Sequence, residues 1–418
     1  MTTTKLDITQ STDAAGRRVL THPERDTITR EELIARARDM VPRLRQRAAA
    51  TEEARHLLPE TVQEFTHAGF FRIVQPKRFG GFELGIDVLE EVVVEVGRGC
   101  GSSAWALAIL GGHSWLSGLF NEEGQCAIFG DEGHVIMATN LSGNGRARPV
   151  EGGYELSGRF IYLSGCDVAN WLCVGAMVED GSDNPPWIYA ALRPGDATIV
   201  DDWFVLGMRG TGSKTVLVDK LLVPAHLTLA QKAVQDQEPP GRFIHPNPMY
   251  AAPMLAFLSI ETTGAAVGVA LQAVDILEEI ARTKPVRGRG SSAVQAYVYE
   301  TPIFRRRFAE ARSLAESART LLVNDARRLM ATMREYAPVN RKHTPQELLD
   351  YTLNASRLVD LCVQAVEHAF AVAGTSATFE GHPLERCFRD IHMLSTHNVY
   401  RIDQIAERWA LAHFNLSQ

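Results

Sequence analysis

The stretch Y-E-L-S-G-R-F-I-Y-L, residues 154–163, marks a change of periodicity in this 418-residue chain. Apolar residues recur there at every second position, which is the period of a strand with one buried face. Similar stretches follow or precede it, separated by turns such as E-G-G and R-P-G-D, at 134–141, 171–178, 187–192 and 215–223. We therefore predict a small antiparallel β domain at residues 133–230.

Helices are predicted before this domain. Residues 30–132 carry the 3.6-residue period of amphipathic helices, and Thr27 or Thr29 is placed to cap the first of them. We predict an N-terminal helical domain over this range, preceded by an extension at residues 1–29.

Helices are also predicted after the β domain. Residues 231–250 are polar enough to predict a mobile linker. Residues 251–418 read as long, alanine-rich amphipathic helices, which typically pack as an antiparallel four-helix bundle. These helices are expected at 251–283, 292–335, 345–373 and 384–412. The predicted fold class is mainly α with a central β domain.

Composition narrows the class of protein. The chain is 45% hydrophobic and 22% charged with a net charge of −7, so no broad basic surface is available for nucleic acid. Its six cysteines show no C-x-x-C spacing, which argues against a disulfide framework or a zinc site. No run approaches the ~18 apolar residues of a membrane span, and the N-terminus lacks the apolar core of a secretory signal. We expect a cytoplasmic protein that binds neither nucleic acid nor membrane.

Three motifs point to functions that we reject. G-R-G-S-S-A (288–293) fits a dinucleotide fingerprint, but it follows a predicted helix rather than a strand. G-M-R-G-T-G-S-K-T (207–215) is similar to a phosphate loop, but a strand follows it where that loop requires a helix. His392 and His397 lie about 140° apart around a helix, so they cannot share one metal ion. We predict no metal site.

Several stretches spread in order over residues 70–400 together resemble one family. They are Q-P-K-R-F-G-G (75–81), S-A-W-A-L (103–107), G-H-S-W (112–115), V-E-G-G-Y-E-L-S-G-R (150–159), S-G-C-D-V-A (164–169), G-T-G-S-K (210–214) and L-E-R-C-F-R-D-I-H (384–392). The chain resembles the oxygenase components of two-component, reduced-flavin-dependent (group D) monooxygenases, which have the acyl-CoA dehydrogenase fold. The nearest pattern is that of p-hydroxyphenylacetate 3-hydroxylase, and indole and dibenzothiophene monooxygenases are more distant.

This resemblance implies a reaction and its partners. An enzyme of this kind takes reduced FAD or FMN and O₂ and hydroxylates an aromatic substrate, phenolic or indole-type, through a C4a-(hydro)peroxyflavin. A separate NAD(P)H-flavin reductase and a homotetramer are also implied. Many dehydrogenases of this fold carry a glutamate base where this chain has Asn398, and an amide cannot act as a base.

The resemblance also implies catalytic roles. Ser164 matches a neutral hydroxyl near the flavin N5, where a dry pocket protects the oxygen adduct. His113 and Thr139 match the pair that binds the substrate oxygen. A histidine near pH 7 can take or share the proton of that oxygen. His397 would orient or protonate the distal oxygen, and Trp105 would line the binding site for the ring. On the residues alone, Ser164 is equally a turn residue and His113 equally a buried core residue.

Flavin binding is implied at the glycine-rich turn. Besides Ser164 and Trp105, the residues that match are Thr211, Gly212 and Ser213. Arg282, with Arg287 as second choice, matches an arginine that reaches the flavin phosphate of a neighbouring subunit. On its own, either arginine is an ordinary cation at a helix C-terminus.

Other functions on this fold stay open. An acyl-CoA dehydrogenase or oxidase would need a base, for which Glu261 on an earlier helix is the nearby candidate. N- or S-oxidation would use the same fold, and a catalytically silent scaffold would need none of these residues. The apolar sequence around Leu255 stands where the hydroxyphenylacetate pattern has an arginine, which favours a larger, neutral aromatic substrate.

Overall fold

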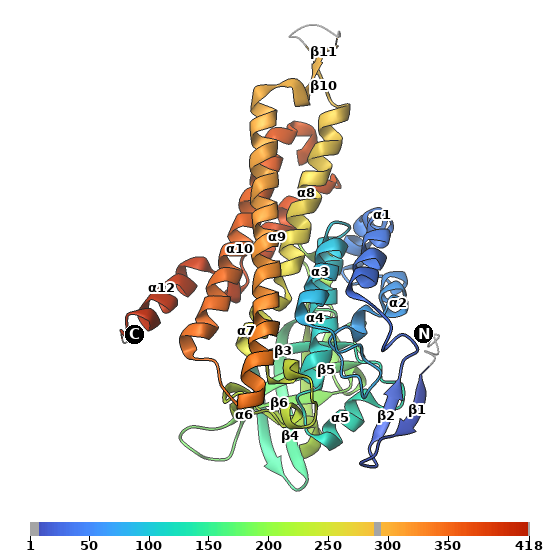
Figure 1. The fold of residues 1–418 in the computed structure, drawn as a ribbon, viewed down its shortest axis with the longest axis vertical. Helices are drawn as coiled ribbons and strands as arrows, with labels where there is room; N and C mark the ends of the chain where they lie inside the picture. Colours follow the sequence, from blue (N-terminus) through green and yellow to red (C-terminus); the bar gives the residue numbers. More distant parts are fainter. Residues whose placement is uncertain (1–7, 288–293, 417–418) are drawn as a thin grey trace.

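The structure is a computed structural model that describes residues 8–287 and 294–416. The G-R-G-S-S-A stretch at 288–293 lies outside the described residues. Long helices run along the longest axis of the molecule, and a β-sheet lies near one end of them (Figure 1). The predicted order of helical domain, β domain and helical bundle is confirmed.

The N-terminal helical domain surrounds one central helix. Thr29 caps the first helix reciprocally with Glu32, which fixes where it begins. In the central helix α4, every residue except Ile109 is buried, which explains why its sequence is apolar all round. The helices of this domain are α1 (Arg30–Ala54), α2 (Pro59–His67), α3 (Ile86–Gly97), α4 (Gly101–Ser117) and α5 (Glu122–Phe129).

The N-terminal extension is packed on this domain. Its strands β1 (Thr9–Thr12) and β2 (Arg18–Thr21) form an antiparallel hairpin. Leu20 is fully buried, and its backbone N–H donates to the Arg78 carbonyl at 2.7 Å. The extension therefore covers apolar surface of the helical domain.

The β domain contains a seven-stranded sheet in the order β7-β8-β4-β3-β5-β6-β9. The strands are β3 (Met137–Val150), β4 (Gly153–Leu163), β5 (Trp171–Val178), β6 (Trp187–Leu192), β7 (Thr198–Val200), β8 (Lys214–Pro224) and β9 (Thr228–Ala230). The prediction of a purely antiparallel sheet is wrong in one place, because β3 and β5 pair in parallel. The chain crosses from β4 over to the far side of β3, and period-two patterning within a strand does not report that crossover.

The segment at 231–250 is not the loose linker that its polarity predicted. It contains the short helix α6 (Gln231–Gln235) and two tight turns, and it packs on the N-terminal domain. A Cβ at Gly241 would lie 1.8 Å from the Gly118 carbonyl oxygen. Tyr250 is buried and donates its hydroxyl to the Val74 carbonyl at 3.1 Å.

The C-terminal region is the expected bundle, with breaks in two of the predicted helices. The helices are α7 (Met254–Glu261), α8 (Thr263–Thr283), α9 (Pro302–Tyr336), α10 (Pro345–Ala373), α11 (Pro383–Leu394) and α12 (Ile402–His413). The helix predicted at 251–283 breaks at Thr262, whose φ is −108°. The helix predicted at 384–412 is interrupted by a turn at Asn398–Tyr400. A small hairpin of β10 (Pro285–Arg287) and β11 (Val294–Tyr297) lies at the far end of the bundle (Figure 1).

One helical stretch among the described residues, Met254–Thr283, is long and apolar enough to cross a membrane by length and composition. The mean hydropathy of its most apolar window is 1.6, and 83% of that window is buried inside the protein. Its place in the fold is therefore that of a core helix.

Candidate functional site

A chain of buried polar groups joins α4 to two loops of the β domain. Trp105 Nε1 donates to Ser164 Oγ at 3.0 Å, and Ser164 Oγ lies 2.7 Å from Ser213 Oγ. Ser213 Oγ in turn lies 2.7 Å from Thr211 Oγ1, which donates to the Met208 carbonyl. Four of the site residues implied by the resemblance are thus brought together in one hydrogen-bonded chain.

The turn that carries Thr211 and Ser213 has a fixed, unusual backbone. Met208 and Gly212 have φ values of 52° and 55°, a region that favours glycine. A Cβ at Gly212 would lie 2.7 Å from Asp167 Oδ2, so a larger residue would displace that carboxyl. The Thr211 carbonyl accepts a hydrogen bond from the Gly165 N–H at 2.8 Å, which ties this turn to the Ser164 loop.

Helix α11 anchors the same turn from the bundle side. Asp390 is buried, and its Oδ1 accepts the Met208 N–H at 2.5 Å. Burial raises the pKa of Asp390 to about 6. A Cβ at Gly207 would lie 2.2 Å from the Arg389 carbonyl oxygen, so the two backbones are in close contact. The R-D pair of the sequence motif therefore holds the turn in place.

His397 follows α11 and faces the tryptophan of the polar chain. The rings of Trp105 and His397 lie 5.6 Å apart at 64°, an edge-to-face contact. His397 remains exposed to solvent, while surrounding protein atoms lower its pKa, which favours the neutral imidazole. His392, by contrast, contacts Glu367 on α10 with Nε2 at 3.2 Å. The two histidines of this segment thus face different elements, α4 for His397 and α10 for His392.

His113 lies deep in the core, and both of its ring nitrogens have a neighbour. Its Nε2 is 3.2 Å from Glu261 Oε2, and its Nδ1 is 3.3 Å from the Met137 carbonyl oxygen. Thr139 is half-buried two residues beyond Met137 on β3, so both residues share one face of that strand. The structure places the predicted substrate pair on adjoining elements, and Glu261 lies on the other side of the imidazole.

Glu261 was missed as a partner of His113 in the sequence. It is buried at the C-terminal end of α7, and burial raises its pKa while the His113 ring opposes that rise. Its Oε1 has no hydrogen-bond partner among the described residues. A Cβ at Gly112 would lie 2.0 Å from that oxygen, so the glycine before His113 makes room for the carboxyl. The adjacent G-H pair was the only local signal of this close approach.

An exposed apolar surface lies along the loops of the polar chain. Tyr162, two residues before Ser164, is 65% exposed, and Phe204 and Leu206 are 73% and 63% exposed. Tyr162 contacts the buried Trp203 edge-to-face at 6.0 Å. Large exposed apolar side chains next to buried hydroxyls suit a planar ring system with polar atoms along one edge. The residues present therefore fit a flavin ring.

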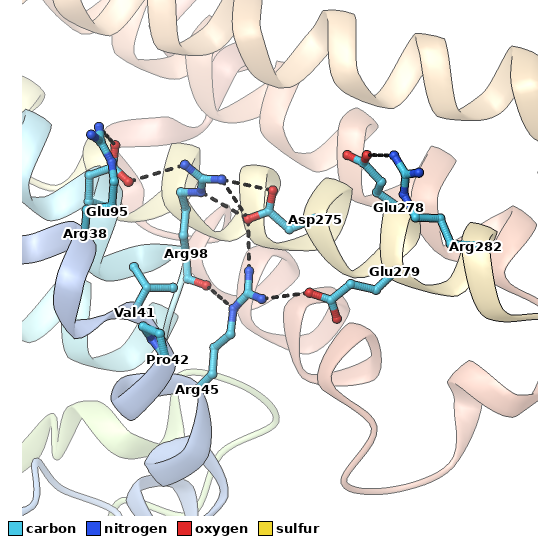
Figure 2. Close-up of a pocket in the computed structure, with 10 residues that line it drawn as sticks. All are labelled: Arg38, Val41, Pro42, Arg45, Glu95, Arg98, Asp275, Glu278, Glu279 and Arg282. Carbon is cyan, nitrogen blue, oxygen red and sulfur yellow. Dashed lines mark hydrogen bonds and ion pairs between the residues drawn. The ribbon is translucent and has the colours of Figure 1, made fainter.

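Arg282 lies apart from this turn within one chain. It lines a cavity of about 510 Å³ between α1, α3 and α8, in which Arg45 and Arg98 pair with Asp275 (Figure 2). Arg282 itself pairs with Glu278 at 2.7 Å and is 74% exposed. None of the residues of the polar chain lines this cavity. The side chain of Arg287 lies outside the described part of the structure.

Metal ligation has no candidate in the described part of the chain. No group of three or more His, Cys, Asp or Glu side chains gathers there as a metal site would require.

Comparison with known proteins gives consistent matches. Residues 261–401 match the family described as "Acyl-CoA dehydrogenase, C-terminal domain". The "Pigment production hydroxylase" of a Rhodococcus species is 32% identical over 91% of this chain and 95% of that protein. The "Flavin-dependent monooxygenase, oxygenase subunit HsaA" of Rhodococcus jostii is 30% identical over 86% of this chain and 92% of that protein. The crystal structure of the 3-HSA hydroxylase from Rhodococcus sp. RHA1 aligns with a TM-score of 0.85 and 26% identity over 93% of this chain and 97% of that chain.

Proposed function

Because this chain belongs to the oxygenase components of two-component flavin-dependent monooxygenases, we propose that it hydroxylates a phenolic or indole-type ring at the site built around Trp105, Ser164 and His113. More distant relatives are named for resorcinol and for indole-3-acetate, which supports these two substrate classes. Reduced FAD or FMN, delivered by a separate reductase, supplies the two electrons that split O₂ into one ring oxygen and one water.

The observation that carries this proposal is the polar chain from Trp105 to Thr211 beside exposed apolar side chains. Ser164, Thr211, Gly212 and Ser213 would bind the polar edge of the flavin, and Trp105 would keep the Ser164 hydroxyl oriented. All of these hydroxyls are neutral and buried, so they bind without offering a base or admitting bulk water.

Three residues would handle the substrate and its protons. Thr139 and His113 lie on adjoining elements and would bind the hydroxyl or ring N–H of the substrate. His397 faces Trp105 as a neutral imidazole, so it can share a proton on that side. The ring of the substrate needs electron density from its oxygen or nitrogen, which is why the proton of that group matters.

An acyl-CoA dehydrogenase is the less favourable alternative. Asn398 stands in the position of the usual base, and the only nearby carboxyl on the earlier helix, Glu261, is buried against Gly112 and His113. A base must reach the carbon from which it removes the proton. The Glu261 carboxyl instead contacts the His113 ring, so it does not face a substrate carbon.

Arg282 would act in a homotetramer. The side chain is exposed and far from the polar chain within one subunit, so a partner subunit is the route by which it would reach flavin phosphate. Sedimentation of the protein with and without flavin tests this, and a monomer under both conditions would contradict it.

The substrate proposal is tested by a panel of phenols, indoles, a thioether and an acyl-CoA, each with chemically reduced FAD or FMN in air. We expect hydroxylated phenol or indole, formed with less H₂O₂ per flavin oxidised than in the absence of substrate. Oxidation of the thioether or the acyl-CoA, with phenols and indoles unchanged, would contradict the proposal.

A further inference from the structure

A buried carboxyl stands behind the histidine that would bind the substrate. We propose that Glu261 is a positioning residue for His113. The Glu261 carboxyl holds the Nε2 edge of the imidazole, and it balances the charge when the ring takes the substrate hydroxyl proton at Nδ1. This inference rests on the proposed function, because it assigns His113 to the substrate oxygen.

The geometry leaves only one edge of the imidazole for a ligand. Glu261 Oε2 lies 3.2 Å from Nε2, within reach of a charge-assisted hydrogen bond. The Met137 carbonyl lies 3.3 Å from Nδ1, slightly beyond the usual range for N–H···O, so that contact is weak and replaceable. Nδ1 also faces β3, the strand that carries Thr139. A substrate oxygen would therefore meet Nδ1.

A carboxylate behind a histidine selects the tautomer of the ring. It accepts only from an N–H, so it places a ring proton on Nε2. When a substrate hydroxyl takes the place of the weak Met137 contact, the lone pair on Nδ1 faces that hydroxyl. The O–H bond of the substrate then breaks, an N–H bond forms at Nδ1, and the electron pair stays on the substrate oxygen. The resulting imidazolium is paired with the Glu261 carboxylate, so no uncompensated positive charge is left in the core.

The position of Glu261 is built into the packing of α4 and α7. The carboxyl lies against the bare Cα of Gly112, at a place where any Cβ would lie 2.0 Å from Oε1. Glu261 is 2% exposed, so solvent does not supply its counter-charge. A side chain held this tightly orients the ring with little freedom on either side.

Other titratable groups around Glu261 are a second acid and a phenol. Glu90 on α3 is fully buried, accepts the Gly264 N–H at 2.7 Å, and has a pKa raised well above its ordinary value by burial. Tyr400, after α11, is paired with Thr262, and its pKa is raised by burial. In both groups burial favours the neutral form. Of these carboxyl and phenol groups, Glu261 is the one that contacts the His113 ring.

Substitutions at Glu261 and Glu90 separate positioning from packing. Glu261→Gln keeps the shape against Gly112 and removes the charge, Glu261→Asp keeps the charge, and Glu90→Gln is the matched buried control. The measurement is the fraction of oxidised flavin that yields hydroxylated phenol, from pH 6 to pH 9, with the best phenol of the substrate panel.

For Glu261→Gln we expect the fraction of oxidised flavin that yields hydroxylated phenol to fall about tenfold at pH 7. A tenfold change corresponds to about 1.4 kcal/mol of lost transition-state stabilisation. The loss should shrink as the pH approaches the ionisation of the free phenol near about 10, because the substrate then arrives without its proton. Glu261→Asp should recover part of the loss, and Glu90→Gln should match the wild type. An equal loss at every pH, or the same loss in Glu90→Gln, would overturn the proposal.

A second readout needs neither flavin nor turnover. The imidazole ¹⁵N chemical shifts of His113 are assigned by their absence from the spectrum of His113→Asn. They should report a proton on Nε2 in the wild type and a changed tautomer in Glu261→Gln. Identical shifts in both proteins would overturn the positioning role. If the wild type hydroxylates no phenol while these shifts do change, the proposed function fails and the pairing of Glu261 with His113 stands.

Discussion

Helix α4 meets a buried carboxyl near each of its ends, and the two carboxyls have different partners. Near Gly101, Asp390 accepts a backbone N–H from Met208, a donor that never titrates. Near Gly112, Glu261 faces the imidazole of His113, a side chain of the kind that serves as an acid or base in catalysis. A carboxyl paired with backbone fixes a loop, whereas a carboxyl paired with histidine can follow a proton. A buried carboxyl therefore fixes a loop at one end of α4, and in our proposal a second buried carboxyl positions a histidine at the other.

The largest effect is expected near Gly112, at His113. His113→Ala should lower product formation about 100-fold, the low end of what a positioned acid or base contributes. Flavin reoxidation should continue and release H₂O₂ instead. His245→Ala is the control, because His245 is also buried and hydrogen-bonded, to Gln125, outside the site. A similar loss of product in the control would show that removal of any buried histidine is sufficient.

At the other end of α4, Asp390→Ala should destabilise the fold by about 1–3 kcal/mol, because the buried Met208 N–H loses its acceptor. Chemical denaturation measures this, and flavin affinity should fall with it. An unchanged free energy of unfolding would show that the turn does not depend on α11.

The same carboxyl gives a pH test with a defined sign. The pKa of Asp390 is about 6 in the fold against 3.8 as its ordinary value, so the native state holds an extra proton between these values. Stability contributed by this group therefore falls as pH rises from about 4 to about 6, by about 3 kcal/mol at most. Asp390→Asn keeps an acceptor oxygen and should remove that slope. A wild type without this slope would place the Asp390 pKa near its ordinary value.

A smaller effect is expected between the two ends of α4. Ser164→Ala leaves Trp105 Nε1 without its acceptor and should raise H₂O₂ leakage about fivefold, as for a lost hydrogen bond of about 1 kcal/mol. Ser114→Ala removes a hydroxyl that is equally buried on α4 and bonds only to the helix backbone. Equal leakage from both variants would remove Ser164 from the flavin site.

The smallest expected effect on stability is at Arg282. Its ion pair with Glu278 is exposed, so Arg282→Ala should change the free energy of unfolding by less than about 0.5 kcal/mol. Flavin affinity should nevertheless fall if the arginine reaches a neighbouring subunit. Arg306→Ala, which removes a similarly exposed pair with Glu310, is the control. Equal flavin affinity in the two variants would argue against an intersubunit role.

What could be predicted from the sequence was mostly local. Helix α10 begins where Thr344 and Glu347 form a capping box, and β5 and β6 occupy the stretches that period-two patterning indicated. The parallel pairing of β3 with β5 could not be predicted, because it depends on how the chain crosses the sheet. The break at Thr262 falls within the short polar stretch E-T-T-G (261–264), which apolar sequence flanks on both sides, so the helical pattern resumes directly after it.

The site divides in the same way. The resemblance assigned Trp105, Ser164 and Ser213 to one site, and they lie in one hydrogen-bonded chain. It gave no partner for His113, because Glu261 is about 150 positions away along the chain and meets it only through helix packing. Such a contact leaves almost no local signal beyond a glycine.

The most direct test of the oxygenase function is rapid mixing of the anaerobic protein, loaded with reduced FAD or FMN, with oxygenated buffer. We predict a transient absorbance distinct from both reduced and oxidised flavin, which decays faster when a phenol or indole substrate is present and yields hydroxylated product. Direct reoxidation in a single step with either flavin, at the rate of free reduced flavin, would contradict it.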